Sequence, residues 1–126
     1  MKTTSEINAM NQSIIEEMVR PVAIDNPLDC IEKLNNLICY LGNSSECISR
    51  SEYLYNQEIN KLIQSGIFES YNATERRLYI DATLRDSLYC VKLSQSVNKD
   101  LHYAIEGLRS IVSAQKEEYK QTIKQS

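Results

Sequence analysis

The sequence predicts an all-α protein, and two observations support this. Apolar residues recur at alternating spacings of three and four over residues 31–62 and again over residues 80–119, which is the period of helices that pack against other helices. Glycine and proline are scarce, with three and two residues in 126. An all-β chain needs turn residues about every ten positions. We therefore expect a long, coiled-coil-like antiparallel hairpin with a short N-terminal helix, which assembles into a helical bundle.

Two units follow from this pattern, residues 1–25 and residues 26–126. The first is a short helix and a turn, because Pro21 ends a run whose apolar residues share one helical face. Those residues are Ile7, Met10, Ile14 and Met18. This segment either docks on the main body or frays. The second unit is the hairpin.

The first long helix is expected at about residues 26–65. Asn26 can cap its start, Pro27 suits a first turn that needs no donor, and Asp29 adds favourable charge there. Gly42 is the one place where the helix could end, but the apolar stripe keeps its register across it, so we favour a continuous or mildly kinked helix. The stripe, called the seam from here on, comprises Leu34, Ile38, Leu41, Ile48, Tyr55, Ile59 and Leu62.

A turn at residues 66–72 and a second helix at about residues 73–121 complete the hairpin. Gly66 can end the first helix in a left-handed conformation, and Asn72 with Glu75 matches a capping box. A connection this short makes the two long helices antiparallel neighbours. The seam of the second helix comprises Leu84, Leu88, Val91, Leu101, Ile105, Leu108 and Val112.

The second helix carries more apolar surface than one partner helix can cover. A second row lies beside the seam and comprises Cys90, Leu93, Val97, Ala104 and Ile111. One helix cannot cover both rows, so we expect a homo-oligomer, a dimer or larger. Polar groups interrupt the seam at Ser94 and Asn98, where they cost stability and often fix register.

Composition excludes several classes of protein. The net charge of −3 is mixed in sign, which fits neither an acidic nucleic-acid mimic nor an obvious nucleic-acid binder. The chain shows no signal peptide and no apolar run near the roughly 20 residues of a membrane span. Its four cysteines form no CxxC pair. We expect a cytoplasmic protein with reduced thiols and no membrane contact, metal or cofactor.

No common catalytic or nucleotide-binding motif occurs in the chain. His102 and Glu106 lie four positions apart on one helical face, which suits a surface pair better than a metal site. A hairpin alone also lacks the concave pocket that enzymes use. We therefore expect a non-enzymatic protein without a small-molecule substrate.

Two sets of side chains are compatible with binding. The first set, candidates for partner contact, comprises Tyr53, Tyr55, Tyr79, Tyr89 and Tyr103. Tyrosine also suits the half-buried edge of a seam, so both interpretations stay open. The second set, candidates for weak nucleic-acid contact, comprises Arg76, Arg77, Lys116, Lys120 and Lys124. The lysines of this set could instead complement the negative end of the helix dipole.

About half of the chain, residues 52–118, carries three marks of a known family. They are the tyrosine-rich helix EYLYNQE at 52–58, the short turn leading into ATER at 73–76, and the ending LRSIVSAQKEE at 108–118. On these marks the chain resembles a family of small all-helical bacteriophage and prophage proteins. Those proteins are often encoded among early replication and recombination genes, so the resemblance implies a setting in a bacterial host and assigns no site residues.

Pattern and resemblance together predict a non-enzymatic, phage-type helical interaction protein. We expect it to be an accessory to DNA recombination or replication, acting through protein partners or weak single-strand contact. One alternative is an inhibitor that binds a host defence enzyme tightly and ignores bare DNA. A second alternative is a virion or scaffold component, which would show open-ended assembly.

Overall fold

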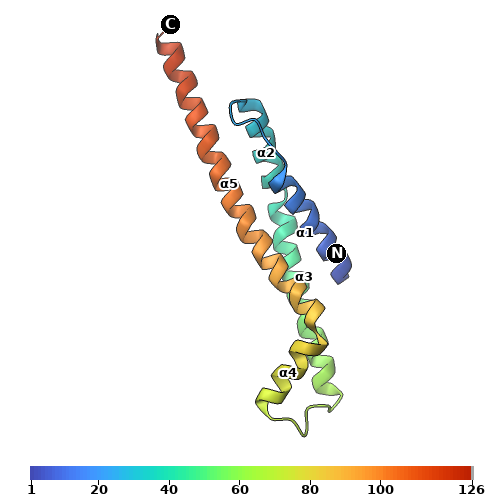
Figure 1. Ribbon diagram of the computed structural model, residues 1–126. Coiled ribbons are helices and arrows are strands. Elements are labelled where there is room, and N and C mark those ends of the chain that lie inside the picture. The colour runs from blue at the N-terminus through green and yellow to red at the C-terminus, as the bar shows by residue number, and fades with distance from the viewer. Residues whose placement is uncertain (126) are drawn as a thin grey trace.

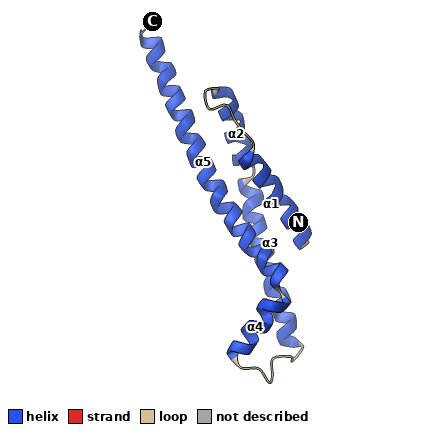
Figure 2. Cartoon of the chain, in the orientation of Figure 1, coloured by secondary structure: helices blue, strands red, loops and turns tan. Residues whose placement is uncertain are grey.

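The computed structural model describes residues 1–125, and helices account for 84% of them (Figure 2). The helices are α1 (Thr4–Val19), α2 (Pro27–Cys39), α3 (Leu41–Gln64), α4 (Ala73–Thr83) and α5 (Arg85–Gln125). No strand occurs within residues 1–125. The predicted all-α class is therefore confirmed.

The chain crosses the molecule three times (Figure 1). α1 runs in one direction, α2 and α3 return end to end, and α4 and α5 run back beside them. α5 packs against α1, α2 and α3, so it is the element that the others share. The middle of the molecule is thus a three-helix bundle in which α3 and α5 are antiparallel. Below it, in the view of Figure 1, α3 and α4 extend past the start of α1.

Side-chain caps begin the helices at the expected places. The Asn26 side-chain oxygen accepts a hydrogen bond from the Asp29 amide at 3.2 Å, and the Asn72 oxygen accepts one from the Glu75 amide at 2.8 Å. α3 ends just before Gly66, which has a φ of +78°. Only glycine adopts that left-handed conformation without strain, so the turn between α3 and α4 follows from the sequence.

The interruption of the first long helix falls at Tyr40 rather than at Gly42, which lies inside α3. Tyr40 keeps a helical backbone, with φ −83° and ψ −8°, and its carbonyl accepts from the Ser44 amide at 2.8 Å. The Tyr40 amide bonds to the Leu37 carbonyl at 3.1 Å, a tighter 3₁₀-type step. α2 and α3 therefore continue as one rod with a short local tightening.

The prediction of a single helix at about residues 73–121 is wrong in two respects. It consists of α4 and α5, which are separated at Leu84, and α5 continues to Gln125. Leu84 has φ −105° and ψ 28°, outside the helical region, and its side chain is buried there. No glycine or proline marks this point, so the sequence contains no local signal for the break.

α1 docks on the bundle and covers the second apolar row of α5. Cys90 and Val97 of that row are buried, and its other members pack against the core. The main core cluster joins α1, α2 and α5 and comprises Ile14, Cys30, Leu37, Val97, Leu101, Ile105, Leu108 and Val112. The excess apolar surface that predicted an oligomer is therefore covered within one chain.

The buried row of the α2–α3 rod differs from the predicted seam. Its buried members are Cys30, Lys33, Leu37, Ser44, Cys47 and Ser51. The predicted seam residues of this rod, Leu34, Ile38, Leu41, Ile48, Tyr55, Ile59 and Leu62, are only partly buried. Serine and cysteine are small enough for α1 to approach the rod closely, and this moves the most buried face toward α1.

On α5, and at Leu84 just before it, the predicted seam coincides with the buried face. Leu84, Val91, Leu101, Ile105, Leu108 and Val112 are buried, and Leu88 is partly buried. Although α5 has 41 residues, neither it nor any other helix within residues 1–125 is long and apolar enough to cross a membrane.

Candidate functional site

The last turns of α5 project past the end of the bundle where α2 begins (Figure 1). We call residues 113–125 the overhang; they span about 20 Å at the rise of an α-helix. The Gln115 side chain donates a hydrogen bond to the Ile24 carbonyl, which holds the α1–α2 loop against the base of the overhang. The other helices therefore pack along the lower part of α5, while its end stands clear of them.

The seam of α5 continues onto the overhang. Val112 is buried, whereas Tyr119, seven positions further on the same face, is 69% exposed. Ile24 and Leu28, at the adjoining end of the bundle, are 64% and 78% exposed. Large apolar side chains thus remain accessible around this end of the molecule, whereas the seam of α5 is buried lower down the helix.

An apolar groove lies between the start of α2 and the overhang, with a volume of about 500 Å³. Its lining comprises Pro27, Ile31, Val112, Gln115, Lys116, Tyr119, Lys120 and Ile123. The two lysines are the only charged residues among them. No ion pair within residues 1–125 joins either lysine to a carboxylate.

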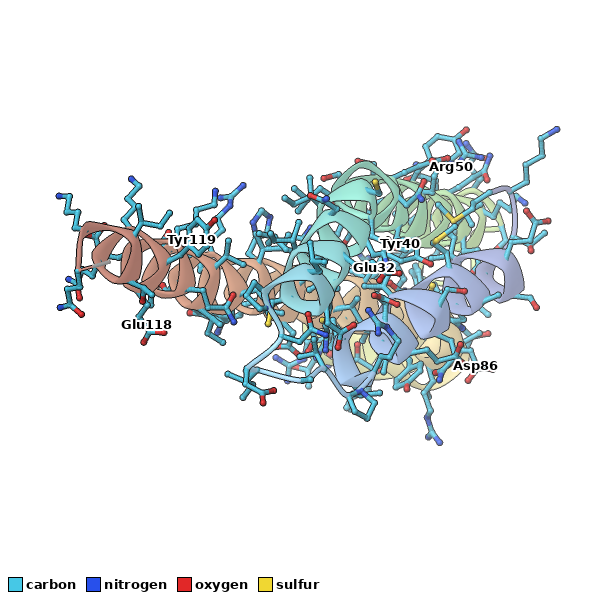
Figure 3. The ribbon with its side chains drawn as sticks, turned by 90° about the horizontal axis from the view of Figure 1, so that it is seen from above. Glu32, Tyr40, Arg50, Asp86, Glu118 and Tyr119 are labelled. Carbon is cyan, nitrogen blue, oxygen red and sulfur yellow. The ribbon has the colours of Figure 1, made fainter. Side chains whose placement is uncertain are left out.

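A second, more polar groove runs along the other side of the overhang, and its lining includes Asp25 and Glu118. Figure 3 shows Tyr119 and Glu118 on different sides of this part of α5. The overhang therefore has a basic edge, an apolar face and an acidic edge. This arrangement suits recognition of another amphipathic surface more than it suits catalysis.

The candidate nucleic-acid residues do not form one surface. Arg76 and Arg77 lie on α4, at the opposite end of the molecule from Lys116, Lys120 and Lys124 on the overhang (Figure 1). Arg76 also donates to the Tyr71 carbonyl at 3.2 Å within the turn between α3 and α4. The phosphate backbone of a bound nucleic acid would thus contact two separate basic groups rather than one continuous basic surface.

The candidate tyrosines are spread over three helices. Tyr53, Tyr89 and Tyr103 are 54%, 60% and 62% exposed. The guanidinium of Arg50 lies 5.4 Å from the Tyr53 ring centroid, and the Lys99 ammonium lies 5.9 Å from that of Tyr103. Fourteen positions, about 21 Å, separate Tyr89 from Tyr103 along α5. These tyrosines therefore do not gather at one site.

Tyr55 and Tyr79 are only partly exposed. Tyr79 meets Phe68 edge-on at 5.7 Å and Tyr71 at 5.9 Å between ring centroids, which packs the tip formed by α4 and the preceding turn. Burial raises the pKa of Tyr55, and the nearby Asp81 carboxylate adds to that effect. The positions of these two tyrosines are accounted for by packing.

The thiols show no sign of a reactive or metal-binding centre. Cys30, Cys47 and Cys90 are buried and Cys39 is exposed. Burial raises the pKa of Cys47 to about 11 and also raises that of Cys90, so both stay protonated and poorly nucleophilic at neutral pH. Within the described part of the chain, no group of three histidine, cysteine, aspartate or glutamate residues could hold a metal ion.

Lys33 is a buried residue that the sequence pattern did not identify. Its ammonium donates hydrogen bonds to the Met18 and Arg20 carbonyls at 2.8 and 2.6 Å. Carbonyls at the end of a helix have no hydrogen-bond partner within it, so Lys33 supplies one and fixes α1 to α2. Burial lowers the pKa of Lys33, as does the nearby Arg20 charge. This contact is structural.

The groove at the overhang was not predicted, although the sequence contained a signal for it. The second predicted helix is longer than the first, and a hairpin with a short turn must leave the end of its longer helix projecting. Lys116 and Lys120 were identified only as candidate phosphate contacts. Their place beside Ile31 and Tyr119 depends on where α2 begins relative to α5, which sequence periodicity does not give.

No family model, no curated protein and no solved structure was found to match this chain. The geometry of the overhang is therefore the main basis for assigning a function.

Proposed function

We propose that this protein is a non-enzymatic helical interaction protein that binds a protein partner at the overhang of α5. The groove beside the overhang is the observation that carries this proposal. An apolar centre with charged residues confined to its edge is typical of a protein-binding surface. Tyr119 supplies an exposed aromatic side chain of the kind that often anchors an interface.

The phage or prophage resemblance of residues 52–118 supplies the cellular setting in this proposal. The protein acts in the cytoplasm of a bacterial host as an accessory to DNA recombination or replication. The separation of the two basic groups favours action through a protein partner over direct contact with single-stranded DNA. Titration of a labelled single-stranded oligonucleotide at low salt checks this, and binding that Lys116→Glu abolishes would favour DNA instead.

Self-association remains a prediction, although the apolar surface that led to it is not free in the structure. The second row of α5, which was expected to contact another copy, is covered by α1. Light scattering at micromolar concentration gives the mass directly. A dimer or larger species would support homo-oligomerisation, and a monomer mass would contradict it.

Affinity purification from the cells that naturally produce the protein tests the proposed function. We expect tagged wild-type protein to retain at least one specific partner that the Tyr119→Asp variant loses. Tyr103→Asp is the matched control, since Tyr103 is similarly exposed on α5 but lies on the three-helix middle. Equal retention of every partner by both variants would contradict binding at the overhang.

A further inference from the structure

We propose that the groove beside the overhang takes an amphipathic α-helix of a different protein, with acidic residues along the edge that faces Lys116 and Lys120. This rests on the proposed function, which requires only that some protein binds at the overhang. The inference adds the secondary structure of the bound segment, its charge and the exclusion of a second copy of this chain.

The periodicity of the groove lining favours a helix as the bound segment. Val112 and Tyr119 are seven positions apart on the same face that α2 covers lower down α5. Such spacing fits the ridges of another helix, with anchoring side chains at i, i+3 or i+4, and i+7. A bound helix would thus continue the line of α2 along the overhang, and about four turns would match its length.

The charge of the lining favours an acidic edge on that helix. Lys116 and Lys120 are exposed and are the only charged residues that line the groove within the described part of the chain. Lys124 follows one turn later on the same edge. Carboxylates spaced one helical turn apart on a bound helix would meet these ammonium groups. The apolar remainder of the lining gives a nucleic-acid backbone little to contact.

The same charges disfavour a second copy as the occupant. A two-fold pairing that lays two overhangs in opposite directions sets each lysine edge against its own counterpart, because a two-fold interface presents the same surface twice. Like charges across an interface are costly. Pairing in the same direction would force the two bundles into one volume, since α2 already covers α5 directly below the overhang.

Two labelled synthetic peptides and the full chain test the inference. Both peptides are 16 residues long with leucine at i, i+3 and i+7; one carries glutamate along one edge and the other carries lysine there. In fluorescence anisotropy we expect the glutamate peptide to bind wild-type protein with a Kd at least about tenfold lower than the lysine peptide. The double variant Lys116→Glu/Lys120→Glu should invert this preference.

The control double variant Lys92→Glu/Lys99→Glu makes the same charge change on exposed residues of the three-helix middle, and it should keep the wild-type preference. Equal affinity for both peptides, no binding of either, or an unchanged preference after reversal at Lys116 and Lys120 overturns the inference. A natural partner lost by Tyr119→Asp would leave the proposed function standing in those cases. A dimer that Tyr119→Asp converts to a monomer would identify the second copy as the occupant and also overturn the inference.

Discussion

The seam of α5 lies in two different environments along a single helix. In the three-helix middle it is covered by α1, α2 and α3, and Leu101 is completely buried. On the overhang the same spacing places Tyr119 at 69% exposure beside a groove. The difference shows that a periodic apolar stripe specifies a face to be covered but does not specify what covers it. Packing within the chain accounts for the middle, and we infer that a partner accounts for the end.

The middle also differs from the overhang in its buried polar groups. The Asn11 side-chain amide donates to the Ser94 hydroxyl at 2.9 Å, and the Asn98 amide donates to the Ser44 hydroxyl at 3.1 Å. Asn11 and Ser94 are completely buried. Hydrogen bonds of this kind inside a helical bundle fix the register of the helices, because any shift would break them, although the Asn11 side-chain oxygen itself has no hydrogen-bond partner among the described residues. Within residues 113–125 of the overhang every residue except Gln115 is exposed, so no comparable buried polar pair occurs there.

The largest expected difference between the two regions is in stability. Leu101→Asp places a carboxylate in the completely buried core and should reduce the free energy of unfolding by about 4 kcal/mol or more. Tyr119→Asp, on the exposed face of the overhang, should change it by less than about 0.5 kcal/mol. Urea unfolding followed by circular dichroism measures both. A stable Leu101→Asp variant, or an equally unstable Tyr119→Asp variant, would break the comparison.

A smaller effect is expected from the buried hydrogen bonds of the three-helix middle, called the polar layer here, in which Asn11 pairs with Ser94 and Asn98 with Ser44. Asn11→Ala removes the hydrogen bond to Ser94 and leaves a small cavity, so we expect a loss of about 2 kcal/mol. Asn35→Ala, on the exposed surface of α2, is the control and should be nearly neutral. The same unfolding measurement applies. Wild-type stability in Asn11→Ala would mean that α1 is not held in register by this layer.

The smallest expected effect depends on pH. Burial alone would raise the pKa of Glu17, but hydrogen bonds from Arg20 and Asn36 hold it below its ordinary value of 4.5. The Glu17 carboxyl therefore binds a proton more tightly in the unfolded chain than in the folded one. The ionised carboxylate stabilises the fold above pH 4.5, and this stabilisation is lost as the pH falls through the folded-state pKa.

Glu17→Gln should accordingly cost about 0.5 kcal/mol at pH 7, the scale of a solvent-screened pair, and less at pH 3, where more of the wild-type Glu17 carboxyl is protonated. Unfolding curves of wild type and variant at the two pH values give the comparison. The exposed neighbour Glu16→Gln is the control and should show no such pH dependence. A deficit of Glu17→Gln that persists unchanged at pH 3 would show that charge is not its cause.

The parts of the fold that depend on local chemistry could be predicted from the sequence. Asn26, Gly66 and Asn72 set helix ends because capping and left-handed turns require particular residue types. The seam of α5 followed from periodicity. The break at Leu84 could not be predicted, because it accompanies burial of that side chain and not a helix-breaking residue.

Features that depend on how distant segments pack could not be predicted from the periodicity of the sequence. From the sequence alone Lys33 is expected at the surface, because only the folded chain brings the Met18 and Arg20 carbonyls to its ammonium group. The structural role of Asn11 likewise follows only from its hydrogen bond to Ser94, which lies far from it in the sequence. The groove at the overhang belongs to the same class, since it arises from the relative ends of α2 and α5.

Amide hydrogen exchange of the full chain tests the central claim most directly, because it compares both regions of α5 in one molecule. We expect strong protection around Leu101 and rapid exchange over residues 113–125, with protection of the latter appearing when the glutamate peptide is added. Protection of the overhang equal to that of the middle in the isolated chain would contradict the account, because the end of α5 would then already be covered.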